Sequence, residues 1–324
     1  MASLEKLKIS LGRRRKGDMV QLLKSRSSSL FIRLVAYFLL FDVAFVFLYP
    51  FLNMLITSVM TIEDLNNIAV KWVPSVLHFK NYQYAYQQLG SANSWGYWGS
   101  LLNSVRLVVL TTFGHVVSCS MVAYALARYH YKGRGLMFVL VLLTIIVPIQ
   151  SIIVPQYIVY SNLHIVEGVL PLIIPTFFGF GLKGGLFVFI FRQFFLGLPG
   201  ELEEAARIDG CGAFRTYVRI IMPVSKTAIL VVSVLSIVWH WNDYFEPALY
   251  LRSQGDFLLP QMLPNIYENM RKAGTDVTMM ENRELYTLGV AMAATVLVVL
   301  PIFILYIFLQ RKFMEGVERT GIVG

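Results

Sequence analysis

Long apolar stretches divide this sequence into membrane-length segments, and they constrain its fold more than any other feature. A helix needs about 20 largely apolar residues to cross the hydrocarbon core of a bilayer, because each residue rises about 1.5 Å and each backbone amide must bond within its own segment. We therefore expect an all-α membrane protein with six transmembrane helices. The predicted spans are 31–58, 101–126, 136–160, 169–195, 227–251 and 285–309.

Composition supports this class, since 56% of the 324 residues are hydrophobic and only 15% are charged. A soluble domain of this length is less apolar. The first stretch exceeds the short apolar region of a cleavable signal peptide, so we expect it to remain as the first span.

The net charge of +9 raises the question of nucleic-acid binding, which the positions of the basic residues answer. If the N-terminus is cytoplasmic, 20 of the 28 Lys and Arg residues fall on the inner side of the six spans and only 6 on the outer side. This asymmetry is typical of the positive-inside rule and places both termini in the cytoplasm. We predict a basic cytoplasmic N-terminal arm over residues 1–30, one six-helix domain over 31–324 and no nucleic-acid partner.

Two polar segments on the outer side, 59–100 and 252–284, are long enough to meet another protein. Prolines and glycines interrupt the middle spans, at Pro148, Pro155, Pro171 and Pro175 and along residues 179–185. Proline removes a helix donor and glycine permits close packing, so these backbones are expected to bend.

The segment 199–223, on the inner side between the fourth and fifth spans, predicts a helix, a turn and a second helix. Acidic residues suit a first turn, where the helix dipole favours negative charge, and Gly210 supplies a stop. A second helix with one apolar stripe follows, and Pro223 ends it. The stripe consists of Phe214, Tyr217, Val218 and Ile221. Such a hairpin suits the groove of another protein, where it would act as a rigid lever, but a hairpin packed only on its own subunit would look similar.

The motif Glu204-Ala205-Ala206-Arg207-Ile208-Asp209-Gly210 resembles the EAA loop of ATP-binding-cassette importer permeases. The fragments 126–129, 132–134, 192–195 and 241–244 extend the resemblance to carbohydrate permeases of the maltose-transporter type, similar to their second, six-helix permease. It covers about residues 30 to 324.

This resemblance implies the type I importer permease architecture, in a bacterial inner membrane, and a set of partners. These are a second homologous permease, two cytoplasmic ATPase subunits and an extracytoplasmic solute-binding protein. The expected ATPase-coupling residues are Glu203, Glu204, Ala205, Ala206, Arg207, Asp209, Gly210 and Phe214. The sequence contains no G-x-x-x-x-G-K-[ST] phosphate loop, so ATP and Mg are expected on the partner ATPases, and this chain is expected to be no enzyme.

Polar residues inside the predicted spans mark a possible substrate pathway. Lys183 lies deep in the fourth span, where we hypothesise that it favours an anionic or strongly hydroxylated saccharide, such as a uronate oligomer. Snorkelling or pairing with a carboxylate would also explain it. Aromatic faces stack on sugar rings and amides bond hydroxyls, although helix packing would also account for the remaining candidates. These are Asp42, Trp239, His240, Asn242 and Asp243.

An ion-coupled secondary transporter is the alternative function, because broken helices and buried Asp42 or Lys183 would suit ion coupling. A membrane enzyme is less consistent with the sequence. The five histidines of this chain are scattered without metal-ligand spacing, and the sequence shows no arrangement typical of a catalytic nucleophile. We therefore predict no catalytic residue, no metal and no cofactor on this chain.

Overall fold

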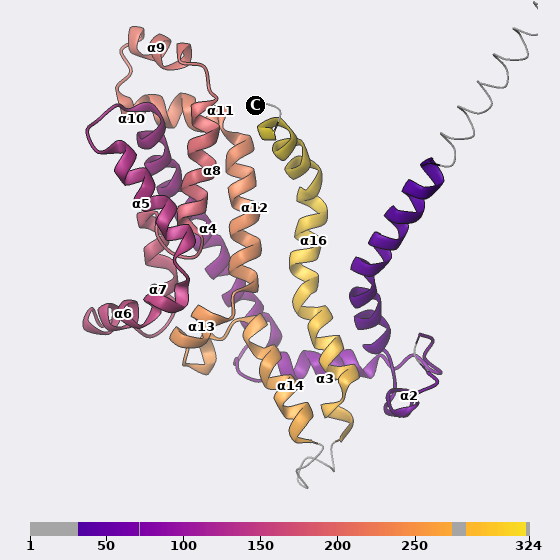
Figure 1. Cartoon of the computed structure of the whole chain (residues 1–324). Coiled ribbons are helices and arrows are strands. Elements are labelled where there is room, and N and C mark those ends of the chain that lie inside the picture. The colour runs from indigo at the N-terminus through magenta and orange to yellow at the C-terminus, as the bar shows by residue number, and fades with distance from the viewer. Residues whose placement is uncertain (1–31, 71, 274–282, 322–324) are drawn as a thin grey trace, which may run out of the picture. The chain divides into compact units, whose positions relative to one another are not determined.

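The computed structural model describes residues 32–70, 72–273 and 283–321, and the secondary structure among them is entirely helical (Figure 1). The predicted arm, residues 1–30, lies outside the described residues. The chain divides into two compact units, Met1–Ile56 and Thr57–Gly324, which are described separately below.

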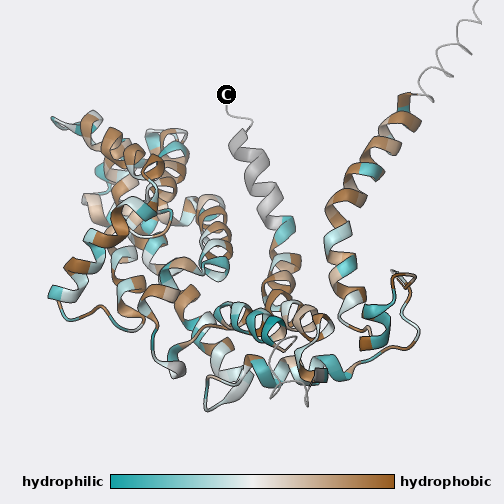
Figure 2. Ribbon diagram, turned by 60° about the horizontal axis from the view of Figure 1, so that its bottom comes forward, coloured by the Kyte–Doolittle hydropathy of each residue, from teal (hydrophilic) through white to brown (hydrophobic). Residues whose placement is uncertain are grey.

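The first unit is described as one helix, which extends over Ile32–Thr57 and has a mean hydropathy of 2.1 in its most apolar window. Figure 2 shows it hydrophobic over most of its length. At about 1.5 Å per residue, its 26 residues are long enough to cross a bilayer. The predicted first span is therefore confirmed as a membrane-length helix, and Asp42 is one of its few charged residues.

The second unit is built around α4 (Gly96–Arg128), which packs on α8 (Gly184–Leu196) and α12 (Lys226–Asn242). Cys119, Ala123, Phe187 and Phe191 are buried where these helices meet, together with Val232 of α12. Small side chains on α4 allow bulky rings from α8 to fill the space between the helices. These three helices position the elements that follow.

The predicted third span is broken, as its prolines indicated. It consists of α5 (Arg134–Ile146) and α6 (Ile149–Asn162), whose axes differ by 104°. Pro148 stands at the break with an extended backbone, whereas Pro155 lies inside α6 without ending it. The predicted bend is therefore confirmed at Pro148, where a proline interrupts the backbone hydrogen bonds, and the predicted break at Pro155 is wrong.

The predicted fourth span, 169–195, is also not one helix. Residues Leu170–Ile173 form α7, Ile174–Phe178 form the 3₁₀ helix η1, and α8 begins only at Gly184. Between them, Gly179, Gly181 and Lys183 have left-handed φ values of 70°, 100° and 64°. The apolar composition predicted one span here, but the left-handed backbone between η1 and α8 ends helical hydrogen bonding.

Short helices form the predicted outer segments and the end of the predicted span 227–251, where α13 is separate from α12; α2, α3, α14 and η5 pack on the last helix, α16 (Leu288–Gly321), and η3 and η4 pack on α4. These elements are α2 (Ile62–Asn66), α3 (Lys80–Leu89), α13 (Phe245–Tyr250), η3 (Gln254–Asp256), η4 (Leu259–Gln261), α14 (Met262–Lys272) and η5 (Arg283–Tyr286). Leu89, Leu259, Ile266 and Val290 form their shared core. The Tyr97 hydroxyl donates to a carbonyl of α16, Leu297 O, at 3.1 Å.

By length and composition, three described helices are able to cross a membrane, and up to six spans result if each bent pair counts as one. This agrees with the predicted six-span fold. Within the second unit, α9 and α10 lie at one end of α4, α8 and α12, and α6, α7 and α13 lie at the opposite end (Figure 1).

Candidate functional site

Residues 199–223 form a helix, a turn and a second helix, as the sequence predicted. The first helix is α9 (Glu201–Ile208), with Glu201, Glu203 and Glu204 in its first turn. It ends in a Schellman motif, in which Cys211 N donates to Ala206 O at 2.9 Å and Gly210 N donates to Arg207 O at 3.1 Å. Gly210 has a φ of 73°, the left-handed conformation that this motif requires.

The second helix comprises α10 (Ala213–Thr216), the π-helical segment η2 (Tyr217–Ile221) and α11 (Met222–Val224). Pro223 occupies the first turn of α11, so the helix ends at Val224 instead of Pro223. The predicted apolar stripe divides in two. Tyr217 and Ile221 are buried, whereas Phe214 and Val218 are exposed. The π-helical bonding replaces the 3.6-residue repeat on which the stripe was predicted.

The hairpin exposes most of the predicted coupling residues. Ala206 is buried and Glu203 is partly buried, and they face the body of the protein. The exposed members are Glu204, Ala205, Arg207, Asp209, Gly210 and Phe214. Two exposed side chains of the hairpin are large and apolar. Phe214 is 68% exposed, and Ile208, which was not among the predicted coupling residues, is 86% exposed. Apolar side chains beside charges at a helical turn have the composition of a docking surface.

Arg128, the last residue of α4, connects the hairpin to the membrane helices. One of its terminal nitrogens, Nη2, donates to Leu198 O at 2.6 Å and lies 3.3 Å from Pro199 O. Its Nε lies 3.4 Å from Glu203 Oε1, as an ion pair without hydrogen-bond alignment. The side chains of Arg128 and Glu203 are 14% and 17% exposed. In the sequence, Arg128 stood out only as part of the fragment 126–129, which resembles the family. Its contact with Glu203 was not predictable, because a sequence gives no distance between residues 128 and 203.

A second connection joins the far helix of the hairpin to α4. The Tyr217 hydroxyl and Ser120 Oγ are 2.7 Å apart, and the Tyr217 ring lies 5.3 Å from that of Tyr124. Both tyrosines are buried. The two connections join both helices of the hairpin to the same membrane helix, α4.

Two predicted pathway residues are close in space. Lys183 has a left-handed backbone immediately before α8, and its Nζ lies 5.6 Å from the centroid of the Trp239 ring on α12. This distance suits a cation–π interaction. The sequence motivated both residues separately, but only the folded loop brings them together.

The other predicted pathway residues of α12 make local contacts. His240 is buried, its Nδ1 lies 2.8 Å from Ser236 O, and its ring is 5.3 Å from that of His115 on α4. Asn242 donates to a carbonyl of its own helix at 2.8 Å, and Asp243 accepts from the N–H two residues later at 3.0 Å. Asp42 lies in the first unit and is described only within its helix. A pathway role for these residues stays a prediction.

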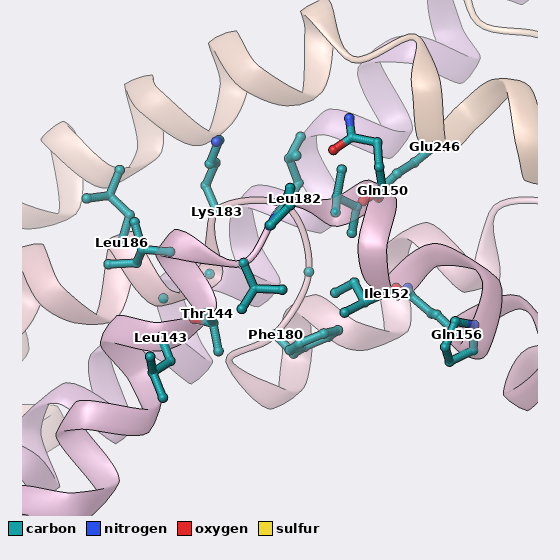
Figure 3. A pocket seen from close by; sticks show the side chains of 18 of the residues that line it. Leu143, Thr144, Gln150, Ile152, Gln156, Phe180, Leu182, Lys183, Leu186 and Glu246 are labelled. Atoms are coloured by element: carbon teal, nitrogen blue, oxygen red, sulfur yellow. The ribbon is translucent and has the colours of Figure 1, made fainter.

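A cavity of about 710 Å³ lies among α5, α6, residues 180–186 and Glu246 (Figure 3). Its lining includes Lys183, Gln150 and Gln156. Glu246 and Gln156 were not among the predicted pathway residues. The signal that drew attention to Lys183, an ionisable residue inside a predicted span, applies equally to Glu246, which falls within the predicted span 227–251.

The described residues contain no group of three or more His, Cys, Asp or Glu side chains placed to hold a metal ion. The two cysteines, Cys119 and Cys211, are free. The candidate site therefore consists of an exposed helical hairpin at one end of the helices and a cavity beside Lys183.

Comparisons with known proteins give consistent results. The sequence model of the family described as "Binding-protein-dependent transport system inner membrane component" matches residues 119–319. The chain is 31% identical to the arabinooligosaccharides transport system permease protein AraQ of Halalkalibacterium halodurans over 284 residues, 87% of this chain and 93% of that protein. It is 28% identical to the probable starch degradation products transport system permease protein AmyC of Thermoanaerobacterium thermosulfurigenes, over 83% of this chain and 89% of that protein.

Another relative is the sn-glycerol-3-phosphate transport system permease protein UgpE of Yersinia pestis, 31% identical over 67% of this chain and 71% of that protein. Among solved structures, a chain of a bacterial ABC transporter involved in the import of the acidic polysaccharide alginate matches with a TM-score of 0.72. It has 20% sequence identity and covers 88% of this chain and 98% of that chain. At this identity the match shows a shared fold.

Proposed function

Because this chain belongs to the family of binding-protein-dependent transport system inner membrane components, we propose that it is a permease subunit of an ATP-driven bacterial importer of oligosaccharides. The resemblance to importer permeases is thereby confirmed, and the chain is a multi-pass inner-membrane permease subunit, not an enzyme. Membership of this family argues against the alternative function, an ion-coupled secondary transporter.

The observation that carries the proposal is the hairpin of residues 199–223. It exposes Ile208 and Phe214 together with the acidic and basic residues of α9, and Arg128 and Tyr217 fix it to α4. In the proposal, a cytoplasmic ATPase subunit buries these two apolar side chains in a groove. Closure of the ATPase pair around ATP and Mg pushes the hairpin, and α4 transmits the movement to the membrane helices.

The partners in this proposal are a second homologous permease, two cytoplasmic ATPase subunits and an extracytoplasmic solute-binding protein. The hairpin end of the helices then faces the cytoplasm, together with both termini and the basic arm 1–30. The opposite end, with α3, α13 and α14, faces the binding protein. The excess of Lys and Arg on the hairpin side supports this orientation.

The names of the relatives support a saccharide substrate. Permeases named for arabino-oligosaccharides and for starch degradation products match this chain over more than four fifths of its length. Within this class, we propose an anionic saccharide such as a uronate oligomer. Lys183 would bind its carboxylates, since this residue lines the cavity. If Lys183→Met takes up a uronate oligomer as fast as wild type does, the proposal of an anionic substrate is refuted. The proposal of an oligosaccharide substrate would be unaffected.

The docking surface is tested with Ile208→Asp and the matched control Ile68→Asp. The two isoleucines are 86% and 87% exposed, and Ile68 lies in an outer segment near α2. Burying an isoleucine contributes about 1.5–3 kcal/mol, so we expect Ile208→Asp to weaken ATPase binding by at least about tenfold. Copurification of the ATPase subunits and ATP hydrolysis in reconstituted complexes are measured for both variants.

We expect Ile208→Asp to lose the ATPase subunits while the permease stays folded, and Ile68→Asp to retain them. Wild-type copurification, hydrolysis and sugar uptake in Ile208→Asp would refute the docking role of the hairpin.

A further inference from the structure

The cavity beside α6 contains buried acceptor atoms without partners. Glu246 in α13 is only 7% exposed, and its Oε1 has no hydrogen-bond partner among the described residues. Gln156 in α6 uses its Nε2 to donate to the Tyr160 hydroxyl at 3.0 Å, which leaves its buried Oε1 unpartnered. Both residues line the cavity. Burying a carboxylate without a partner is costly, so a protein retains such a group only with a compensating ligand or role.

Two cationic side chains of this region have contacts of their own. Lys183 places its Nζ over the Trp239 ring, and Arg252 donates from Nη2 to the Tyr157 hydroxyl at 2.9 Å. The described ion pairs do not include Glu246. Glu246 Oε1 and Gln156 Oε1 are therefore both free to accept a hydrogen bond from a bound molecule.

The remaining lining restricts what such a donor is. Leu143, Ile152, Phe180 and Leu182 give the cavity apolar walls, and about 710 Å³ lies within the range of small-molecule sites. Apolar walls with a few acceptors match a sugar ring, whose C–H faces are apolar and whose hydroxyls donate hydrogen bonds. A metal ion fits poorly, because the described residues provide no cluster of metal-ligating side chains here.

The cavity is also chemically asymmetric. In Figure 3, Lys183 is set apart from Gln150 and Glu246, with Leu182 between them. A carboxylate is disfavoured beside Glu246 by like-charge repulsion, so the Glu246 end suits the hydroxyl groups of a sugar unit. The lining comes from α5, α6, residues 180–186 and Glu246 of α13, and α6 and α13 lie at the end of the helices opposite the hairpin (Figure 1).

We propose that this cavity is a saccharide subsite on this subunit, in which Glu246 and Gln156 accept hydrogen bonds from the hydroxyls of one sugar unit. The inference rests on the proposed function and adds to it, because it assigns sugar contact to this chain and not to its partner permease alone. The subsite binds a sugar unit on its way through the membrane.

The experiment uses the complex purified in lipid nanodiscs with its partner permease and its two ATPase subunits, but without the solute-binding protein. Three probes are titrated: arabinotriose, maltotriose and a mannuronate trisaccharide. Binding is measured by calorimetry, and the melting temperature is measured without sugar. The variants are Glu246→Leu, Glu246→Gln and Gln156→Leu. The matched control is Glu167→Gln, which changes an exposed glutamate outside the cavity lining.

We expect Glu246→Gln to weaken binding of the preferred trisaccharide about tenfold, because a neutral acceptor replaces a charged one. Glu246→Leu is expected to bind the trisaccharide at least about 100-fold more weakly, yet to melt at the wild-type temperature or above, because it removes an uncompensated buried charge. Gln156→Leu is expected to weaken binding as well, and Glu167→Gln to bind as wild type does.

Undiminished binding in both Glu246→Leu and Glu246→Gln would overturn the subsite. If Glu246→Leu fails to fold, Glu246→Gln and Gln156→Leu decide the question. A wild-type complex that retains its ATPase subunits and binds none of the three probes would also overturn the subsite, while leaving the coupling role of the hairpin in place. Loss of the ATPase subunits from wild type would instead contradict the proposed function.

Discussion

Replacing Arg128 by methionine is expected to loosen the hairpin without unfolding the membrane helices. The substitution keeps most of the side-chain length and removes the guanidinium. It removes the hydrogen bond to Leu198 O at 2.6 Å, the weaker contact to Pro199 O at 3.3 Å and the ion pair with Glu203 at 3.4 Å. The α9 end of the hairpin then loses its polar connection to α4.

The magnitude follows from these contacts. A hydrogen bond from a charged donor contributes about 1.5–3 kcal/mol. The ion pair adds only about 0–1 kcal/mol, since both side chains are partly exposed and its geometry is not that of a hydrogen bond. We therefore expect the free energy of local opening of α9 to fall by about 2–3 kcal/mol. Amide exchange in α9 should accelerate by about 30- to 150-fold.

Hydrogen–deuterium exchange on the reconstituted protein measures this change, with α9 as the reporter and the core of α4 as the internal reference. Lys132→Met is the matched control, because it also removes one positive charge from the same inner segment, at an exposed side chain. Unchanged exchange of α9 in Arg128→Met would refute the reasoning. Equal acceleration in Lys132→Met would show that general charge, and not the contacts of Arg128, stabilises the hairpin.

Two glycine pairs provide further predictions. Gly210→Ala should destabilise the hairpin by about 1 kcal/mol, because φ is 73° there, while Gly212→Ala, at a φ of −71° and also in open space, should be neutral; exchange of α9 amides measures both. Gly185→Ala should lower the melting temperature, because its Cβ would clash with Thr144 Oγ1 and lie 2.8 Å from the backbone oxygen Val141 O, while Gly135→Ala meets no atom within 4 Å and should melt as wild type does. A neutral Gly210→Ala or Gly185→Ala would contradict the corresponding prediction.

The sequence predicted the local properties of the hairpin well. Acidic residues before an apolar run and a glycine after it depend only on neighbouring residues, so α9 and its stop at Gly210 were predictable. The division of the stripe between buried Tyr217 and exposed Phe214 was not predictable, because a π-helical turn depends on packing against α4.

The broken spans show a similar division. Apolar composition predicted membrane residence for 169–195, and Pro171 and Pro175 indicated a bend. The position at which α8 starts depends on three left-handed residues, including Lys183, for which a left-handed backbone is unfavourable in isolation. The surrounding packing stabilises that conformation, so it was not readable from the residue type.

Sequence alone thus predicted the membrane-length segments and the motif that marks the family, and it gave the orientation that the proposal uses, because these properties depend on composition and on short spacings along the chain. Only the tertiary structure revealed that Arg128 connects α4 to the hairpin and that Glu246 and Gln156 share a cavity with Lys183. These residues are far apart in sequence, and their proximity depends on how bent helices pack. That packing is a property of the whole fold and of no single segment.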